Sequence, residues 1–196
     1  MTPLRWIAVA LLILIVAPFL FLAQVSPEWE ITSGAKPVPA PAARIVEYLS
    51  HLEEWQTWAL PEGVDGKWTY SDPSHGVGAT FTFSSERAGE RTLELTAIDE
   101  ISGSTVVRYV LGVGGDAAPV EGSFTVTPNG AECTVEWVIQ GVVPDGPLRG
   151  LMSIATRLQG SKDLERGINS LADLFKTGAV SSEVGAPLER RAPKGE

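Results

Sequence analysis

Apolar residues recur with a helical period close to the C-terminal end of the chain, over residues 161–176. They are Leu164, Ile168, Leu171, Ala172 and Phe175. This spacing puts them on one face of an α-helix. Ser161 suits the N-cap, and Lys176 followed by Gly178 marks the end. Since the preceding sequence has the period of strands, the pattern predicts a helix that packs on a sheet.

A second apolar stripe precedes this helix, over residues 148–158. It consists of Leu148, Leu151, Met152, Ala155 and Leu158. At about 100° per residue, this stripe is out of phase with the following one by about half a turn. We therefore expect two helical segments, with a break at residues 159–161, Gln-Gly-Ser.

Between residues 67 and 140 the pattern alternates with a period of two, which is typical of half-buried strands. Glycine turns separate the alternating runs. The apolar set predicts an inner wall of Phe81, Phe83, Leu93, Leu95, Val107, Tyr109, Leu111, Phe124, Val126, Val135, Trp137 and Ile139, with Ala97 on the parity of Leu95. Residues of the opposite parity, expected to point outward, include Glu94, Arg108, Glu121 and Glu136. The sequence thus predicts an antiparallel meander with one apolar face and no charged group on it.

Shorter elements precede the meander. The sequence predicts a first strand over residues 29–36. Pro41 is well placed to open a helix, whose apolar face would be Ile45, Tyr48, Leu49 and Leu52. Trp55 and Trp58 continue in a second short helical piece.

The chain begins with an uninterrupted apolar run, residues 6–23, about long enough to cross a bilayer. A cleaved signal peptide is the alternative, but the run exceeds the usual apolar region of such peptides. Arg5 before the run and Glu28 after it place the N-terminus in the cytoplasm by the positive-inside rule. We expect a membrane anchor over residues 1–25, an extracytoplasmic domain over 26–177 and a disordered polar tail over 178–196, in a single-pass protein of the cell membrane.

Composition narrows the function classes. The 196 residues carry a net charge of -9, which argues against nucleic-acid binding because phosphates require clustered Lys and Arg. Cys133 is the single cysteine, so an internal disulfide and a paired-cysteine metal site are excluded. No nucleotide-binding loop or metal-binding motif occurs, and we expect neither a cofactor nor a metal.

Three motifs follow the order of elements described above: residues 36–58, the glycine turn at residues 76–83, and the helical residues 162–174. In this order they resemble the opening motif, the glycine turn and the C-terminal helix of the START/Bet v 1-like (SRPBCC) superfamily, in its polyketide cyclase/dehydrase-like branch. Many members of the branch also carry one N-terminal membrane segment. The resemblance implies an α+β helix-grip fold, an antiparallel sheet wrapped around a long C-terminal helix, here preceded by one transmembrane helix.

The resemblance also implies an apolar cavity between sheet and helix; a closed core is the alternative. The expected ligand-binding residues are Phe81, Phe83, Leu95, Tyr109, Phe124, Trp137, Met152 and Ile168. The first hypothesis is a membrane-tethered binding module for a hydrophobic small molecule or lipid. The second is an enzyme of the cyclase/dehydrase kind, with His51, Tyr109 or His75 as acid–base groups. The third is a protein-interaction module that uses the outer sheet face or the Trp55 and Trp58 region.

Overall fold

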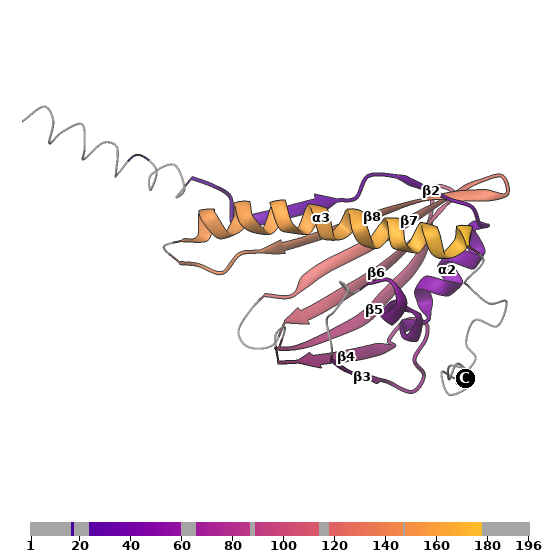
Figure 1. Ribbon diagram of the computed structural model, residues 1–196, viewed down its shortest axis with the longest axis horizontal. Helices are drawn as coiled ribbons and strands as arrows, with labels where there is room; N and C mark the ends of the chain where they lie inside the picture. Colours follow the sequence, from indigo (N-terminus) through magenta and orange to yellow (C-terminus); the bar gives the residue numbers. More distant parts are fainter. Residues whose placement is uncertain are drawn as a thin grey trace, which may run out of the picture.

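The computed structural model, which describes residues 17, 24–59, 66–86, 89–113, 118–146 and 148–177, has one eight-stranded antiparallel sheet with a long helix along it (Figure 1). The strands are β1 (Glu28–Thr32), β2 (Lys36–Val38), β3 (Lys67–Tyr70), β4 (Thr80–Ser85), β5 (Gly89–Ile101), β6 (Ser104–Val113), β7 (Val120–Asn129) and β8 (Glu132–Val142). The helices are α2 (Ala42–Ser50), the 3₁₀ helix η1 (Leu52–Thr57) and α3 (Arg149–Lys176). This arrangement confirms the expected α+β helix-grip fold.

The sheet runs in the order β1-β8-β7-β6-β5-β4-β3, so that β3 to β8 form the expected meander. The single first strand expected over residues 29–36 is two strands, β1 and β2, and both pair with β8. Gly34 lies between them with a φ of 66°, a left-handed conformation that interrupts a strand. Pro41 directly precedes α2, as expected.

The prediction of two helical segments is wrong. Residues 149–176 form one continuous α-helix, and neither Ser161 nor Gly160 interrupts it. Gly160 approaches β1 closely, because a Cβ atom at this position would lie 2.4 Å from Ile31 Cδ1. Gly160 therefore allows close contact between α3 and β1 and does not interrupt the helix. We call residues 149–160 the proximal half of α3 and residues 161–176 the distal half.

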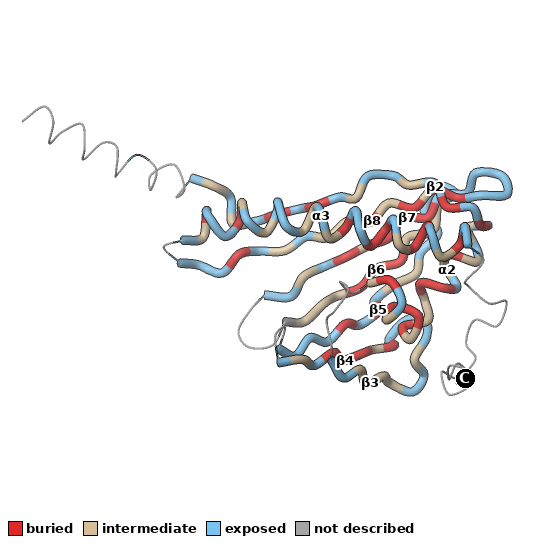
Figure 2. The backbone as a smooth tube through the Cα atoms, in the orientation of Figure 1, coloured by how far each residue is buried: buried red, intermediate tan, exposed pale blue. Residues whose placement is uncertain are grey.

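The parity of the strands is confirmed, apart from one bulge. Twelve residues were expected on the inner wall; ten of them are buried, and Leu111 and Ile139 are half-buried (Figure 2). Arg108 lies on the outer face, where it pairs with Asp99, and Glu94 is exposed. A bulge between Leu95 and Ala97 shifts the register, so that Ile98 and not Ala97 lies opposite the buried Val107.

The apolar run expected as a membrane anchor and the polar tail lie outside the described residues, except for Ala17. Within the part of the chain that the structure describes, no helix is long and apolar enough to cross a membrane.

Candidate ligand-binding cavity

A cavity of about 260 Å³ lies between the concave face of the sheet, η1 and the distal half of α3. Helix α3 packs over β1, β2 and β8, and α2 covers β6 to β8, so the space between them is left to side chains (Figure 1). The cavity is lined by Trp55, Trp58, Ala59, Trp68, Phe81, Phe83, Arg91, Leu93, Tyr109, Leu111, Val120, Trp137, Ile139, Asp163, Leu164, Arg166 and Gly167.

A larger hollow of about 540 Å³ lies elsewhere, near the start of β1. Its lining includes Glu28, Glu30, Glu121 and Gln140, and most of its residues are exposed. We regard it as a polar surface depression. The smaller cavity is the candidate site because it combines apolar walls with buried polar groups.

Aromatic rings form the deep wall of the cavity and fix its shape. The ring of Trp55 meets that of Tyr109 edge-on at 5.3 Å between centroids, and Trp58 meets Trp137 in the same way at 5.6 Å. Phe124 stacks on Trp137 at 5.0 Å. Such offset and edge-on contacts each add stability beyond area burial. The rings of this wall therefore hold one another in place.

The polar groups of this wall are hydrogen-bond donors. Trp137 Nε1 donates to the Tyr109 hydroxyl oxygen at 2.8 Å, and Trp55 Nε1 donates to the carbonyl of Leu49 at 3.0 Å. Burial raises the pKa of Tyr109 well above its usual range, so the phenol stays protonated. Within the described residues, the proton of that phenol has no acceptor.

Trp58 contributes an unpaired donor. The residue is 3% exposed, and its Nε1 is buried without a hydrogen-bond partner among the described residues. Most buried indole N–H groups in folded proteins have a partner, and leaving one unpaired costs about 1–3 kcal/mol. An acceptor brought within reach of this N–H would relieve this cost.

The open end of the cavity lies where the strands carry partly exposed residues. Arg91 is exposed, and Leu111, Val120 and Ile139 are half-buried, whereas Leu95 further along β5 is 0% exposed. Strand pairing places Arg91, Val113, Val120 and Val142 at one end of the sheet, the end at which β1 begins. The cavity thus opens toward the end of the domain that follows the apolar N-terminal run.

Charged groups border this opening, which the sequence analysis missed. Arg91 shares the parity of Leu93 and Leu95, so extending the alternation by one step toward the start of β5 would have found it. From α3, Arg166 and Asp163 form an ion pair, and Gln159 also donates to Asp163 at 3.1 Å. No partner is found for Arg91 among the described residues.

The eight expected ligand-binding residues fall into three groups. Phe81, Phe83, Tyr109 and Trp137 line the cavity. Leu95, Phe124 and Ile168 are each 0% exposed and belong to the packed core behind it. Met152 is 52% exposed and does not line the cavity, because the unbroken helix carries its stripe to the outside.

The two histidines lie together but away from the cavity. The rings of His51 and His75 stack at 5.1 Å, and the two residues form an isolated β-bridge. His51 Nδ1 is 2.8 Å from the carbonyl oxygen of Glu47. Neither histidine lines the cavity, so Tyr109 alone of the three suggested acid–base groups reaches it. The described residues contain no group of His, Cys, Asp and Glu able to hold a metal.

Gly167 shows how closely α3 approaches the sheet. A Cβ atom there would lie 2.6 Å from Cζ3 of the Trp137 ring. The sequence left open whether the helix glycines make room for a ligand or for the sheet. At Gly167 the room is taken by Trp137, which closes one side of the cavity.

Comparisons with known proteins agree with this architecture. A family model described as polyketide cyclase / dehydrase and lipid transport matches residues 31–176, more than half of the chain. No curated protein matches the chain in sequence.

Solved structures share the fold at low identity. Norcoclaurine synthase from Thalictrum flavum, in complex with dopamine and hydroxybenzaldehyde, has a TM-score of 0.55 and 14% identity, covering 79% of this chain and 90% of its own. A protein of unknown function from Staphylococcus aureus has a TM-score of 0.60 and 8% identity, covering 78% and 96%. A hypothetical protein from Helicobacter pylori has a TM-score of 0.57 and 8% identity, covering 76% and 89%. At these identities the likeness concerns the fold alone.

Proposed function

Because the chain belongs to the polyketide cyclase / dehydrase and lipid transport family, we propose that it binds a small apolar molecule in the cavity beneath α3, and that the N-terminal apolar run tethers it to a membrane. The observation that carries the proposal is the indole N–H of Trp58. Trp58 lines the cavity, and its Nε1 is a buried donor for which the described residues supply no acceptor. The ligand therefore has an apolar body and at least one hydrogen-bond acceptor, such as a carbonyl oxygen.

The size of the cavity limits the ligand further. Drug-sized molecules occupy pockets of about 300–1,000 Å³, and this cavity has about 260 Å³. That space suits a compact ring system or one short chain. It does not suit a lipid with two acyl chains held entirely inside.

Arg91 favours ligands with an acidic group at the opening. Its side chain lies on the face of β5 that lines the cavity, and no described residue pairs with it. Arg108, in contrast, lies on the outer face and is paired with Asp99. An arginine at the rim of an apolar site attracts carboxylates and phosphates. We therefore place the acceptor-bearing apolar body inside and the anionic group, where the ligand has one, at Arg91.

The state of Tyr109 argues against base catalysis in the cavity. A phenol held protonated by burial can donate a hydrogen bond to a carbonyl, but it does not serve as a base at neutral pH. In the cyclase/dehydrase alternative, Tyr109 acts as the acid. That alternative predicts a changed product after incubation with a carbonyl compound, and a carrier predicts unchanged ligand.

The test is the occupancy of the purified full-length chain, by native mass spectrometry from micelles and extraction of what co-purifies. We expect an apolar molecule with an acceptor. Trp58→Phe keeps the ring and removes the N–H, and should weaken retention roughly tenfold, as expected for about 1.4 kcal/mol. Arg108→Gln on the outer face is the matched control and should retain ligand fully. An empty wild-type chain that also ignores added decanoic and 2-naphthoic acid would refute the proposal.

A further inference from the structure

The proximal half of α3 carries apolar side chains on its outside. Leu151, Met152 and Leu158 are 51%, 52% and 65% exposed, and Leu148, which directly precedes the helix as its N-cap, is 52% exposed. At about 100° per residue, they and the exposed Ala155 fall within one third of the helix circumference. We call these five residues the outer stripe. A contiguous apolar stripe on a surface marks a contact with something apolar.

The fold itself has no use for the outer stripe. The proximal half faces the sheet with Gly150 and Ser153, both buried, so its leucines are not needed as core. The distal half is built the other way, with Leu164, Ile168 and Leu171 buried. Because the helix is continuous, the half-turn phase difference between the two apolar stripes places them on opposite sides.

The outer stripe lies beside the point where the chain leaves the apolar N-terminal run. Ser153 Oγ donates to the carbonyl of Ser26 at 3.1 Å, and Arg157 Nη2 donates to the carbonyl of Glu28 at 2.7 Å. The run ends at Ala23, three residues before Ser26, and three extended residues span at most about 11 Å. If the run sits in a bilayer, the proximal half of α3 is held at the bilayer surface.

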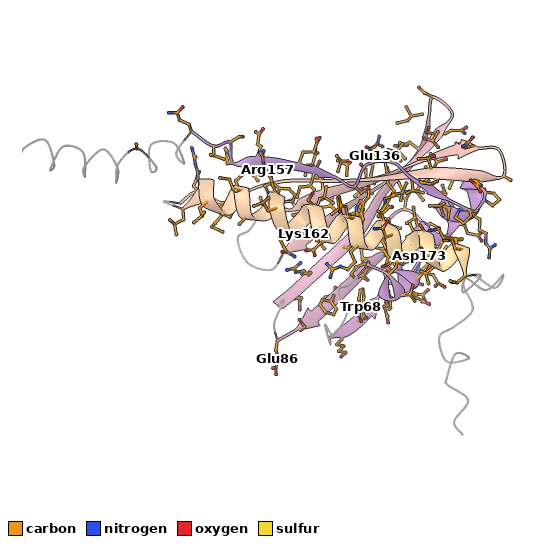
Figure 3. All side chains as sticks on the ribbon, turned by 45° about the horizontal axis from the view of Figure 1, so that its top comes forward. Trp68, Glu86, Glu136, Arg157, Lys162 and Asp173 are labelled. Atoms are coloured by element: carbon orange, nitrogen blue, oxygen red, sulfur yellow. The ribbon has the colours of Figure 1, made fainter. Side chains whose placement is uncertain are left out.

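The outer face changes character abruptly along the helix. One turn beyond Leu158 the same face carries Lys162, and from there on it is polar, with Asn169 and Asp173. Figure 3 labels Lys162 and Asp173. A lysine at the end of an apolar stripe is suited to the phosphate level of a membrane, because its stem lies on apolar surface while its ammonium stays solvated. The boundary between apolar and polar positions therefore matches a boundary between hydrocarbon and water.

We infer that the outer stripe inserts into the bilayer surface, so that the domain docks on the lipid with the proximal half of α3. Amphipathic helices bind in this way, with the apolar face about 5–10 Å deep in the headgroup region. The net charge of -9 makes the contact hydrophobic, independent of anionic lipid. Since the cavity opens at the same end of the sheet, the docked domain takes up its ligand from the bilayer; this step and the membrane tether rest on the proposed function.

Site-specific labelling of the full-length chain in phosphatidylcholine vesicles tests the docking. Cys133 is the only cysteine, is 1% exposed, and has its pKa raised to about 11 by burial, so introduced cysteines react selectively at neutral pH. Leu151→Cys and Leu158→Cys are labelled with an environment-sensitive fluorophore. Asn169→Cys is the matched control, because five helical turns separate it from Leu151 and it has the same angular position on α3.

We expect a blue shift and quenching by nitroxide-labelled lipids at positions 151 and 158, unchanged by salt, with neither at 169. A chain that floats with the vesicles while the labels at 151 and 158 remain as hydrated as at 169 overturns the docking alone. A chain that does not float overturns the tether as well. A blue shift that grows with protein concentration without lipid, and escapes the lipid quencher, assigns the outer stripe to a second copy and also overturns the inference. Ligand retention, measured as above, reports separately on the cavity.

Discussion

In the distal half of α3, Leu164, Ile168 and Leu171 face the sheet and the polar residues face water; in the proximal half, small residues face the sheet and leucines face outward. Both halves belong to one helix of 28 residues with the same backbone geometry. The difference lies in what each half contacts. The distal half closes a cavity by apolar packing, and the proximal half is fastened to the first residues of the domain by hydrogen bonds. An amphipathic pattern thus gives the face of a helix that avoids water, without saying whether protein covers it.

The largest effect we expect is the loss of stability on truncating a leucine in the distal half, in contrast to truncating one in the proximal half. Leu171 is 0% exposed, and Leu171→Ala should lower the free energy of unfolding by about 2–5 kcal/mol, because it removes packing and leaves a cavity. Leu158 is 65% exposed, and Leu158→Ala should change the same quantity by no more than about 0.5 kcal/mol in the absence of lipid. Chemical denaturation of both variants measures the contrast. Equal losses would mean that the outer stripe is core after all.

A smaller effect should follow from adding a methyl group at the two close approaches to the sheet. Gly167→Ala should cost about 1–3 kcal/mol, because the new Cβ meets the indole of Trp137, which its neighbours hold in place. In Gly160→Ala the only close approach below 3 Å is to Cδ1, the flexible end of Ile31. There the gain in helix propensity, about 1 kcal/mol, should offset the strain. Thermal unfolding separates the two, and a Gly167→Ala chain as stable as wild type would show that α3 can move away from the sheet.

We expect the hydrogen bond between Ser153 and Ser26 to contribute less to the free energy of unfolding than either packing effect. Ser153 is fully buried and donates to the carbonyl of Ser26, so Ser153→Ala should lower the free energy of unfolding by about 0.5–1.5 kcal/mol. Ser170 in the distal half has no hydrogen-bond partner among the described residues, and Ser170→Ala is the control, expected to cause no loss. If the two variants behave alike, the contact with Ser26 contributes nothing to stability.

The sequence predicted the fold well because strand parity and helical period are local properties. The inner wall and the outward Arg108 follow from alternation alone. The break in α3 was inferred wrongly, because two stripes of different phase were assumed to need the same side of the helix. Trp58 could be placed in a short helical piece but not identified as an unpaired donor, because pairing depends on residues far apart in the chain. The bulge after Leu95 was missed for the same reason: a register shift becomes visible only against the partner strand.

The smallest effect concerns pH and the cavity under the distal half. Burial raises the pKa of Tyr109 in the folded chain, while the unfolded phenol titrates near its usual value of about 10. Above that pH the unfolded state releases a proton that the folded state keeps, so the free energy of unfolding should fall as pH rises beyond about 10.

Cys133, with a pKa of about 11 against 9.0, should add a decline that begins near pH 9. Denaturation curves from pH 8 upward measure both. Tyr109→Phe lowers stability throughout, because Trp137 Nε1 loses its acceptor, but it should make the decline above pH 10 shallower. The remaining decline belongs to Tyr70, because burial raises its pKa to about 12. Cys133→Ala should flatten the earlier part. A decline that keeps its full slope in Tyr109→Phe would place the titrating group outside the cavity, and the wall under α3 would then be more hydrated than its packing indicates.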